Sequence, residues 1–70
     1  MNAQVVKEYI AANYGHIVPY NAEITGSELA DRISKQYDPT EPHNNYAIEA
    51  AAELGGRWSR KGNGVIEWRN

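Results

Sequence analysis

The chain has no cysteine and no long apolar run. These two absences exclude disulfide-bonded proteins, zinc–thiolate proteins and proteins with a membrane-spanning helix. Without thiols it cannot form disulfides or bind zinc through thiolates, and the lack of cysteine is compatible with a reducing compartment. No apolar stretch approaches the roughly 20 residues that a membrane-spanning helix requires. The first residues have neither a basic start nor an apolar block, so we expect no signal peptide. We therefore expect a cytoplasmic protein that does not enter a membrane.

The chain also contains no phenylalanine, so tyrosine and tryptophan must supply the aromatic part of its core. Its 70 residues make a single domain, residues 1–70, with a marginal core, because a chain this short buries only about 60% of its unfolded surface. We expect Tyr9 and Tyr37 in that core because they fall on apolar helical faces. The sequence leaves the places of Tyr14 and Tyr20 open.

Patterns that carry catalysis or metal binding are absent too. His16 and His43 lie in expected loops, and Asp38 and Glu41 near His43 make only a weak set of ligands. The Gly62–Gly64 turn lacks the lysine and hydroxyl residue of a phosphate loop, and it precedes a strand instead of a helix. A domain of this size has little room for a deep catalytic pocket. We therefore expect no enzyme activity, no metal and no cofactor.

The formal charge is −2, and the charged residues are unevenly distributed. Residues 1–56 hold three basic and eight acidic side chains, whereas residues 57–70 hold four basic side chains and one acidic side chain. Such an asymmetry is typical of a local basic contact on an acidic body. A segment this short can also be basic by chance, so charge alone leaves the partner open.

The first helix is expected at residues 3–14. Four apolar residues recur there at the spacing of one helical face: Val5, Val6, Tyr9 and Ile10. Gly15 follows and is well placed as the left-handed residue that ends a helix. Residues 16–23 are interrupted by a proline and too short for another helix, so we expect an extended connection.

The second helix, residues 26–37, has the clearest start. Thr25 precedes it as an N-cap, and Glu28 is expected to complete a capping box by reaching back to the Thr25 amide. Ile24 and Leu29 flank this boundary as a hydrophobic staple. The helix ends before Asp38–Pro39, because a residue that precedes proline avoids the α region.

The third helix is expected at residues 45–54, after a loop over residues 38–43, with Asn44 or Asn45 as its cap. Two glycines, Gly55 and Gly56, end it. The expected inner positions are Ala47, Ile48, Ala51 and Leu54. The expected outward positions are Asn45, Tyr46, Glu49, Ala50 and Glu53.

The last segment, residues 57–69, predicts a β-hairpin, because glycine and asparagine at 62–64 tolerate the positive φ of a tight loop. A three-residue loop pairs Trp58 with Trp68, whereas a two-residue loop puts the tryptophans on opposite faces. We favour the three-residue loop, with Gly64 left-handed, because a chain with few large apolar residues should bury both tryptophans together.

This order of elements resembles the winged helix-turn-helix family over nearly the whole chain. The resemblance is carried by the helix entry Ile24–Ala30, the segment Ala51–Gly56 and the turn Gly62–Gly64. It implies an α+β domain of three helices followed by a C-terminal two-stranded hairpin, the wing. Small domains of this kind are common among phage and prokaryotic regulators, which implies a transcriptional regulator that binds double-stranded DNA as a homodimer.

The resemblance places the third helix in the major groove and the wing on phosphates or in the minor groove. The residues that it nominates for nucleic-acid binding are Arg57, Arg60, Lys61, Asn63, Arg69, Asn44 and Asn45. The third helix departs from the family pattern, because it offers no Arg or Lys to the DNA and exposes Glu49 and Glu53. A simpler interpretation of the wing is that Arg57 and Arg69 pair with acidic neighbours such as Glu67.

The alternative function is a non-enzymatic protein-interaction module, such as an adaptor or a phage-type inhibitor of a host protein. Tyr46, Glu49 and Glu53 on the third helix would then contact a basic partner. A simpler role for Tyr46 is to cover the proline-containing loop. The acidic third helix favours a protein partner, whereas the frequency of DNA binding in the family favours the regulator.

Overall fold

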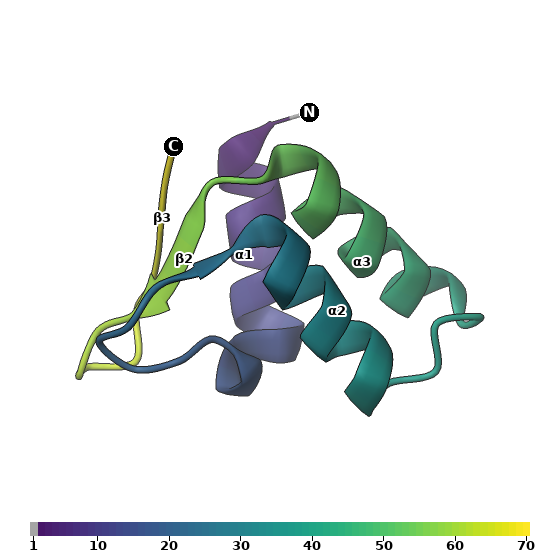
Figure 1. Cartoon of the computed structure of the whole chain (residues 1–70), viewed down its shortest axis with the longest axis horizontal. Coiled ribbons are helices and arrows are strands. Elements are labelled where there is room, and N and C mark those ends of the chain that lie inside the picture. Colours follow the sequence, from purple (N-terminus) through teal and green to yellow (C-terminus); the bar gives the residue numbers. More distant parts are fainter. Residues whose placement is uncertain (1) are drawn as a thin grey trace.

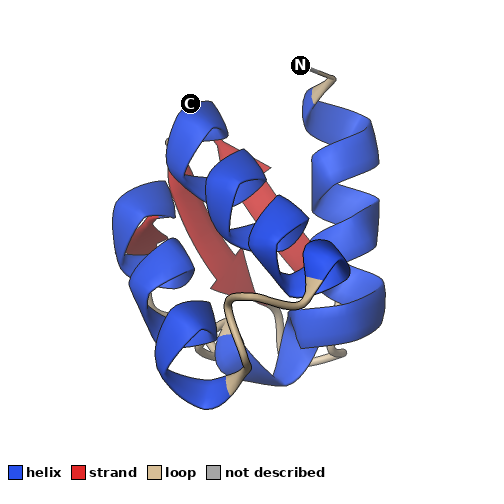
Figure 2. Cartoon of the chain, turned by 90° about the vertical axis from the view of Figure 1, so that its right-hand side faces the viewer, coloured by secondary structure: helices blue, strands red, loops and turns tan. Residues whose placement is uncertain are grey.

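The structure, a computed structural model, describes residues 2–70 and contains three α-helices and a small antiparallel sheet (Figure 1). The elements in chain order are α1 (Ala3–Tyr14), the 3-10 helix η1 (Gly15–Ile17), β1 (Ile24–Thr25), α2 (Gly26–Gln36), α3 (Pro42–Leu54), β2 (Arg57–Arg60) and β3 (Ile66–Arg69). Figure 2 shows the strands on one side of the three helices. The predicted α+β class with three helices and a C-terminal hairpin is confirmed.

The sheet has three strands in the order β1-β2-β3, so the prediction of two strands was wrong in this detail. Ile24 pairs with Trp58 and Thr25 pairs with Arg57, which places β2 at the centre. A strand of two residues is too short to show the alternation by which strands are recognised in a sequence. The added strand ties the start of α2 to the hairpin.

The N-terminal helix has the predicted bounds, but Gly15 does not end it as predicted. The Asn2 side chain caps it by accepting hydrogen bonds from the amides of Gln4 and Val5. Gly15 is not left-handed, because its φ of −55° lies in the right-handed helical region. The chain therefore tightens into η1 instead of leaving the helix at Gly15.

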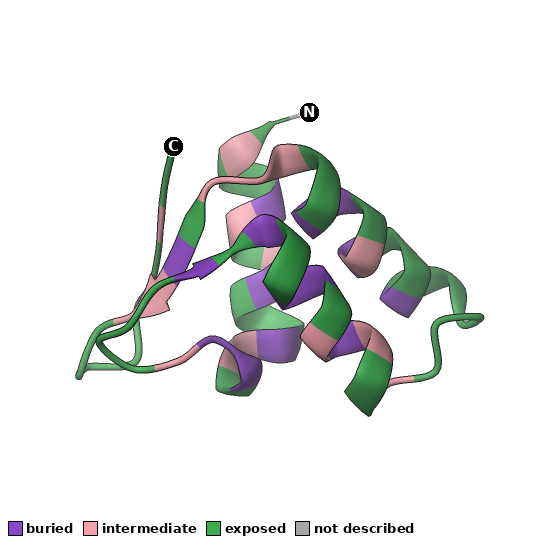
Figure 3. Cartoon of the chain, viewed as in Figure 1, coloured by how far each residue is buried: buried purple, intermediate pink, exposed green. Residues whose placement is uncertain are grey.

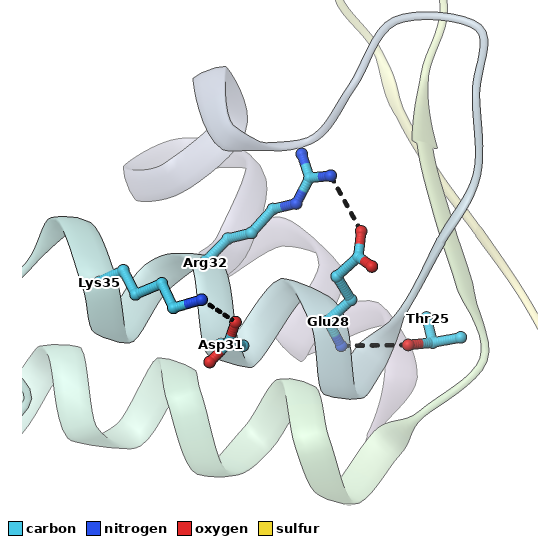
Figure 4. Close-up of polar contacts among 5 residues, drawn as sticks. All are labelled: Thr25, Glu28, Asp31, Arg32 and Lys35. Carbon is cyan, nitrogen blue, oxygen red and sulfur yellow. Dashed lines mark hydrogen bonds and ion pairs between the residues drawn. The ribbon is translucent and has the colours of Figure 1, made fainter.

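The start of α2 confirms the predicted N-cap and half of the predicted capping box. Thr25 Oγ1 accepts a hydrogen bond from the Glu28 amide at 3.0 Å (Figure 4). The Glu28 carboxylate is directed elsewhere and accepts from Arg32 Nη2 at 2.9 Å. Asp31 and Lys35 form a second ion pair on the same helix. These i,i+4 pairs lie on the exposed side of α2, where solvent screens them and they add little to stability.

The third helix begins three residues earlier than predicted, at Pro42, and neither Asn44 nor Asn45 caps it. Glu41 is the N-cap residue, and Pro42 occupies the first helical position. Proline suits this position because its φ is already helical and the amide it lacks would have no helical partner. The earlier start places Asn44 inside the helix, where it is only 5% exposed.

The core lies between the helices and the inner face of the sheet (Figure 3). Its largest fully buried side chains are Trp58, Tyr14, Ile10, Leu29, Ile33, Val6 and Val18. Ala50 was predicted to face outward but is buried together with Ala47 and Ala51. Helices α2 and α3 approach so closely at Gly26 that a β-carbon there would overlap the backbone of Ala51 and Gly55.

The hairpin has the predicted three-residue loop. Trp58 pairs with Trp68, the Lys61 amide donates to Val65 O at 2.8 Å, and Gly64 has a φ of +88°. Trp58 is fully buried and Trp68 is half-buried. Both indole N–H groups donate to the carbonyl oxygen of Gly55, at 3.1 Å and 3.0 Å. This shared acceptor joins the hairpin to the end of α3.

Candidate interaction surfaces

Arg69 forms the best-defined ion pair of the hairpin, and its partner is Glu23, not Glu67. Its Nε and Nη2 atoms donate to the two carboxylate oxygens at 2.8 Å and 2.7 Å. Hydrogen bonding from Arg69 holds the pKa of Glu23 below its usual value, and Glu23 raises the pKa of Arg69 in return. Such a bidentate pair fixes the guanidinium in one orientation. Arg69 therefore anchors the segment before β1 to β3.

Arg60 is held against the segment that precedes β1. Its Nε donates to Val18 O at 3.0 Å, and its guanidinium carbon lies 3.8 Å from the centroid of the Tyr20 ring. The backbone is paired as well, because the Arg60 amide donates to Pro19 O and the Asn21 amide donates to Arg60 O. These contacts give Arg60 a structural role beside any contact with a ligand.

The hairpin tip, residues 61–65, is exposed throughout. Lys61 lies 3.6 Å from Glu67, which is a loose contact between two exposed side chains. Asn63 Oδ1 accepts from the Val65 amide at 3.0 Å and so stabilises the turn. Among residues 2–70, Arg57 forms no ion pair, and its side chain is exposed.

The two asparagines nominated for DNA contact lie in different environments. Asn45 is exposed at the start of α3. Asn44 is buried, and it accepts a hydrogen bond from the Tyr14 hydroxyl at 2.6 Å and donates one to Asp38 O at 3.0 Å. Its amide group is therefore used inside the domain, and Asn44 is not available to a ligand at the surface.

The exposed side of α3 brings together Tyr46, Glu49 and Glu53, because their spacing of three and four residues places them on one face. Tyr46 is 43% exposed. Its ring meets the Tyr9 ring edge-on, with centroids 5.1 Å apart, and the Tyr9 hydroxyl donates to His43 O at 3.1 Å. Tyr46 thus packs against α1.

Helix α1 extends this surface. Val5 is one turn before Tyr9 and is 54% exposed, and Glu8 is exposed beside it. We call these residues the acidic α1–α3 face: Val5, Glu8, Tyr9, Tyr46, Glu49 and Glu53. It combines apolar and aromatic side chains with three carboxylates. Helix α3 contains no Lys or Arg, and the single lysine of α1, Lys7, lies toward the sheet.

A network of hydroxyl groups lies directly beneath this face. Tyr14 is buried among Tyr9, Tyr37 and Asn44, and burial raises the pKa of its hydroxyl to about 12, with further contributions from the neighbouring tyrosines. The Tyr14 hydroxyl therefore stays protonated and remains a donor to Asn44 throughout the physiological pH range. The sequence offered no sign of this network, because Asn44 had been placed at a helix cap.

Surface cavities lie beside the hairpin and at the start of α2. One, of about 300 Å³, is lined by Lys7, Glu23, Arg57, Ser59, Glu67, Trp68 and Arg69. A second, of about 360 Å³, lies at the start of α2 and is lined by Thr25, Gly26, Ser27, Gly55, Gly56, Arg57 and Asn70. The first cavity brings Lys7 and Glu23 next to the hairpin arginines. Neither residue could be placed there from its sequence position.

Within residues 2–70, no three His, Asp or Glu side chains come together in a group that could hold a metal ion. His16 Nε2 instead lies 3.0 Å from the Tyr37 hydroxyl. No helix in this described part of the chain is both long and apolar enough to span a membrane. Comparison of the chain with protein-family models, curated proteins and solved structures finds no match.

Proposed function

We propose that this chain is a non-enzymatic winged-helix interaction module that binds a basic protein surface through the acidic α1–α3 face. One observation carries the proposal: Tyr46, Glu49 and Glu53 are exposed together on a helix that has no Lys or Arg. A face with charges of one sign recruits a partner of opposite sign and rejects partners of the same sign. The phosphate backbone of DNA belongs to the rejected class.

The aromatic residues of this face support a protein partner. Tyrosine is enriched among the residues that dominate binding energy at protein interfaces. Tyr46 is held in place by the edge-on contact with Tyr9, so it loses little freedom when it binds. Val5 adds exposed apolar area one turn away. The face therefore offers an apolar centre with carboxylates around it, which is the usual layout of a specific interface.

The test is site-specific photo-cross-linking from position 46 in cells that express the chain. The matched control carries the same photoreactive residue at position 35, which is exposed on α2. We expect an adduct with a basic protein from position 46 alone, and we expect Glu49→Gln/Glu53→Gln to remove it. An adduct that forms equally from both positions, or that persists after both carboxylates are neutralised, contradicts the proposal.

The second candidate function is DNA binding through the hairpin. The exposed tip with Lys61 and Asn63 favours it, together with Arg57, which forms no ion pair within the described residues 2–70. Removing Arg60 or Arg69 is a poor test, because both hold the segment before β1. The informative variant is Arg57→Gln/Lys61→Gln in fluorescence anisotropy with random duplex DNA. Binding that weakens steeply with salt and is lost in this variant would establish this function in place of the first.

A further inference from the structure

The face of the sheet opposite the buried Trp58 carries two arginines directly across from one another. Arg57 in β2 and Arg69 in β3 are register partners, so their side chains leave the same face side by side. Like charges at directly opposed positions destabilise a β-ladder. Glu23 offsets part of this repulsion by accepting both of its hydrogen bonds from Arg69. Within residues 2–70 Arg57 forms no ion pair of its own, although its charge adds to the effect of Arg69 in lowering the pKa of Glu23.

These arginines border the cavity of about 300 Å³, and five other residues line it with them. Lys7 enters from α1, Ser59 contributes a hydroxyl from the same face of β2, and Trp68 adds an apolar wall. The cations outnumber the carboxylates by three to two. The two carboxylates, Glu23 and Glu67, are each paired with a basic side chain.

We propose that this cavity binds a phosphate group, with Arg57 and Lys7 as its principal charged contacts. The planar guanidinium of Arg57 presents N–H donors in a fork that matches two phosphate oxygens, and Lys7 adds a compact positive charge. The Ser59 hydroxyl is a further donor. Arg69 is held by Glu23 and contributes its charge from a fixed position.

The size of the cavity limits what surrounds the phosphate. A volume of about 300 Å³ is at the small end of ligand pockets, so it accommodates a phosphate and one attached sugar or comparable group. That phosphate belongs either to a small phosphorylated molecule or to a nucleic-acid backbone, and the chemistry of recognition is the same. The site lies on the sheet and α1, away from α3, and its failure would leave the proposed protein-binding face untouched.

The experiment is an NMR titration of the ¹⁵N-labelled chain with sodium phosphate, with sodium chloride of equal ionic strength as the reference. The reporters are the backbone amides of Ser59 and Trp68 and the Arg57 Nε–H, because these three residues line the cavity. We expect saturable shifts at millimolar phosphate, at least a tenfold loss of affinity in Arg57→Gln, and a smaller loss in Lys7→Gln. Lys35→Gln, which removes an exposed cation on α2, should bind like the native chain.

Ribose 5-phosphate and a short random DNA duplex then identify the source of the phosphate. Tighter binding of ribose 5-phosphate assigns the site to a small molecule, and tighter binding of the duplex with the same dependence on Arg57 assigns it to nucleic acid. Either result supports a phosphate site. Shifts that do not saturate, that chloride reproduces, or that persist unchanged in Arg57→Gln overturn the proposal. The thermal unfolding temperature of each variant shows that it is folded.

Discussion

The Tyr14 hydroxyl donates a hydrogen bond to Asn44 Oδ1 at 2.6 Å, and this contact joins the C-terminal end of α1 to the first turn of α3. Asn44 also donates to Asp38 O, so the turn between α2 and α3 is tied into the same network. The contact between the rings of Tyr9 and Tyr46 joins the same two helices. The alignment of α1 with α3, and therefore of the acidic α1–α3 face, depends on this buried polar connection.

Replacing Tyr14 with phenylalanine should destabilise the domain by about 1–3 kcal/mol, because it removes the donor and leaves the buried Asn44 oxygen unsatisfied. Urea unfolding followed by circular dichroism measures the change. Tyr20→Phe is the matched control, because Tyr20 is exposed and its ring stays available to Arg60. Equal midpoints for Tyr14→Phe and the native chain would show that the buried hydrogen bond contributes nothing.

The raised pKa of Tyr14 predicts a loss of stability in alkali. The unfolded chain releases this proton near pH 10, whereas the folded chain keeps it until about pH 12. The unfolded state therefore binds fewer protons between these values, and the free energy of unfolding falls as pH rises through this range. Urea midpoints at pH 8, 10 and 11 should fall more steeply for the native chain than for Tyr14→Phe. If the urea midpoints of the native chain and Tyr14→Phe fell equally with pH, the pH dependence could not be assigned to Tyr14.

The lowered pKa of Glu23 predicts the opposite dependence in acid. Its carboxylate ionises more readily in the folded state, because Arg69 donates to it. The pair therefore stabilises the fold above the ordinary Glu pKa of 4.5, and this contribution is lost as pH falls through the lower folded value. Glu23→Gln should lower the urea midpoint at pH 7 and approach the native midpoint in acid. Glu67→Gln, which removes a looser pair, should show a smaller effect at pH 7.

Two neighbouring basic residues of the hairpin should respond very differently to truncation. Arg60→Ala removes a charged hydrogen bond to Val18 O and the contact with Tyr20, so we expect a loss of about 1–3 kcal/mol in the free energy of unfolding. Lys61→Ala should change it by less than about 0.5 kcal/mol, because the side chain is exposed and its ion pair is long. Similar losses of stability in both variants would contradict the structural role of Arg60 against the segment that precedes β1.

The features that the sequence predicted correctly depend on local chemistry. Thr25 caps α2 through an amide three residues away, and Gly64 adopts the positive φ that a tight loop demands. The pairing of Trp58 with Trp68 followed from this loop length and from the need to bury apolar surface. Each of these inferences needed only neighbours in the chain or one simple pairing rule.

The features that it missed depend on tertiary contacts. Ala50 carries no information about which side of a helix is buried, because alanine is small and is accepted on either side. Asn44 was predicted as a possible helix cap. Its buried partner, Tyr14, lies 30 residues away, so the hydrogen bond between them could not be foreseen from the sequence. The candidate DNA contacts Arg60 and Arg69 were correctly identified as basic, but their partners Val18 and Glu23 are distant in the chain. Charge could be counted from the sequence, whereas the groups that hold each basic side chain could not be identified.

The most direct test of the acidic α1–α3 face is the dissociation constant for the partner recovered by cross-linking at position 46, measured with purified proteins at two salt concentrations. We expect Glu49→Gln/Glu53→Gln to weaken binding by about tenfold and to reduce its salt dependence, because two charge pairs across the interface are lost. Asp31→Asn, which removes an exposed carboxylate of α2, should leave both unchanged. Equal affinities of the native chain and the Glu49→Gln/Glu53→Gln variant at both salt concentrations would contradict the account.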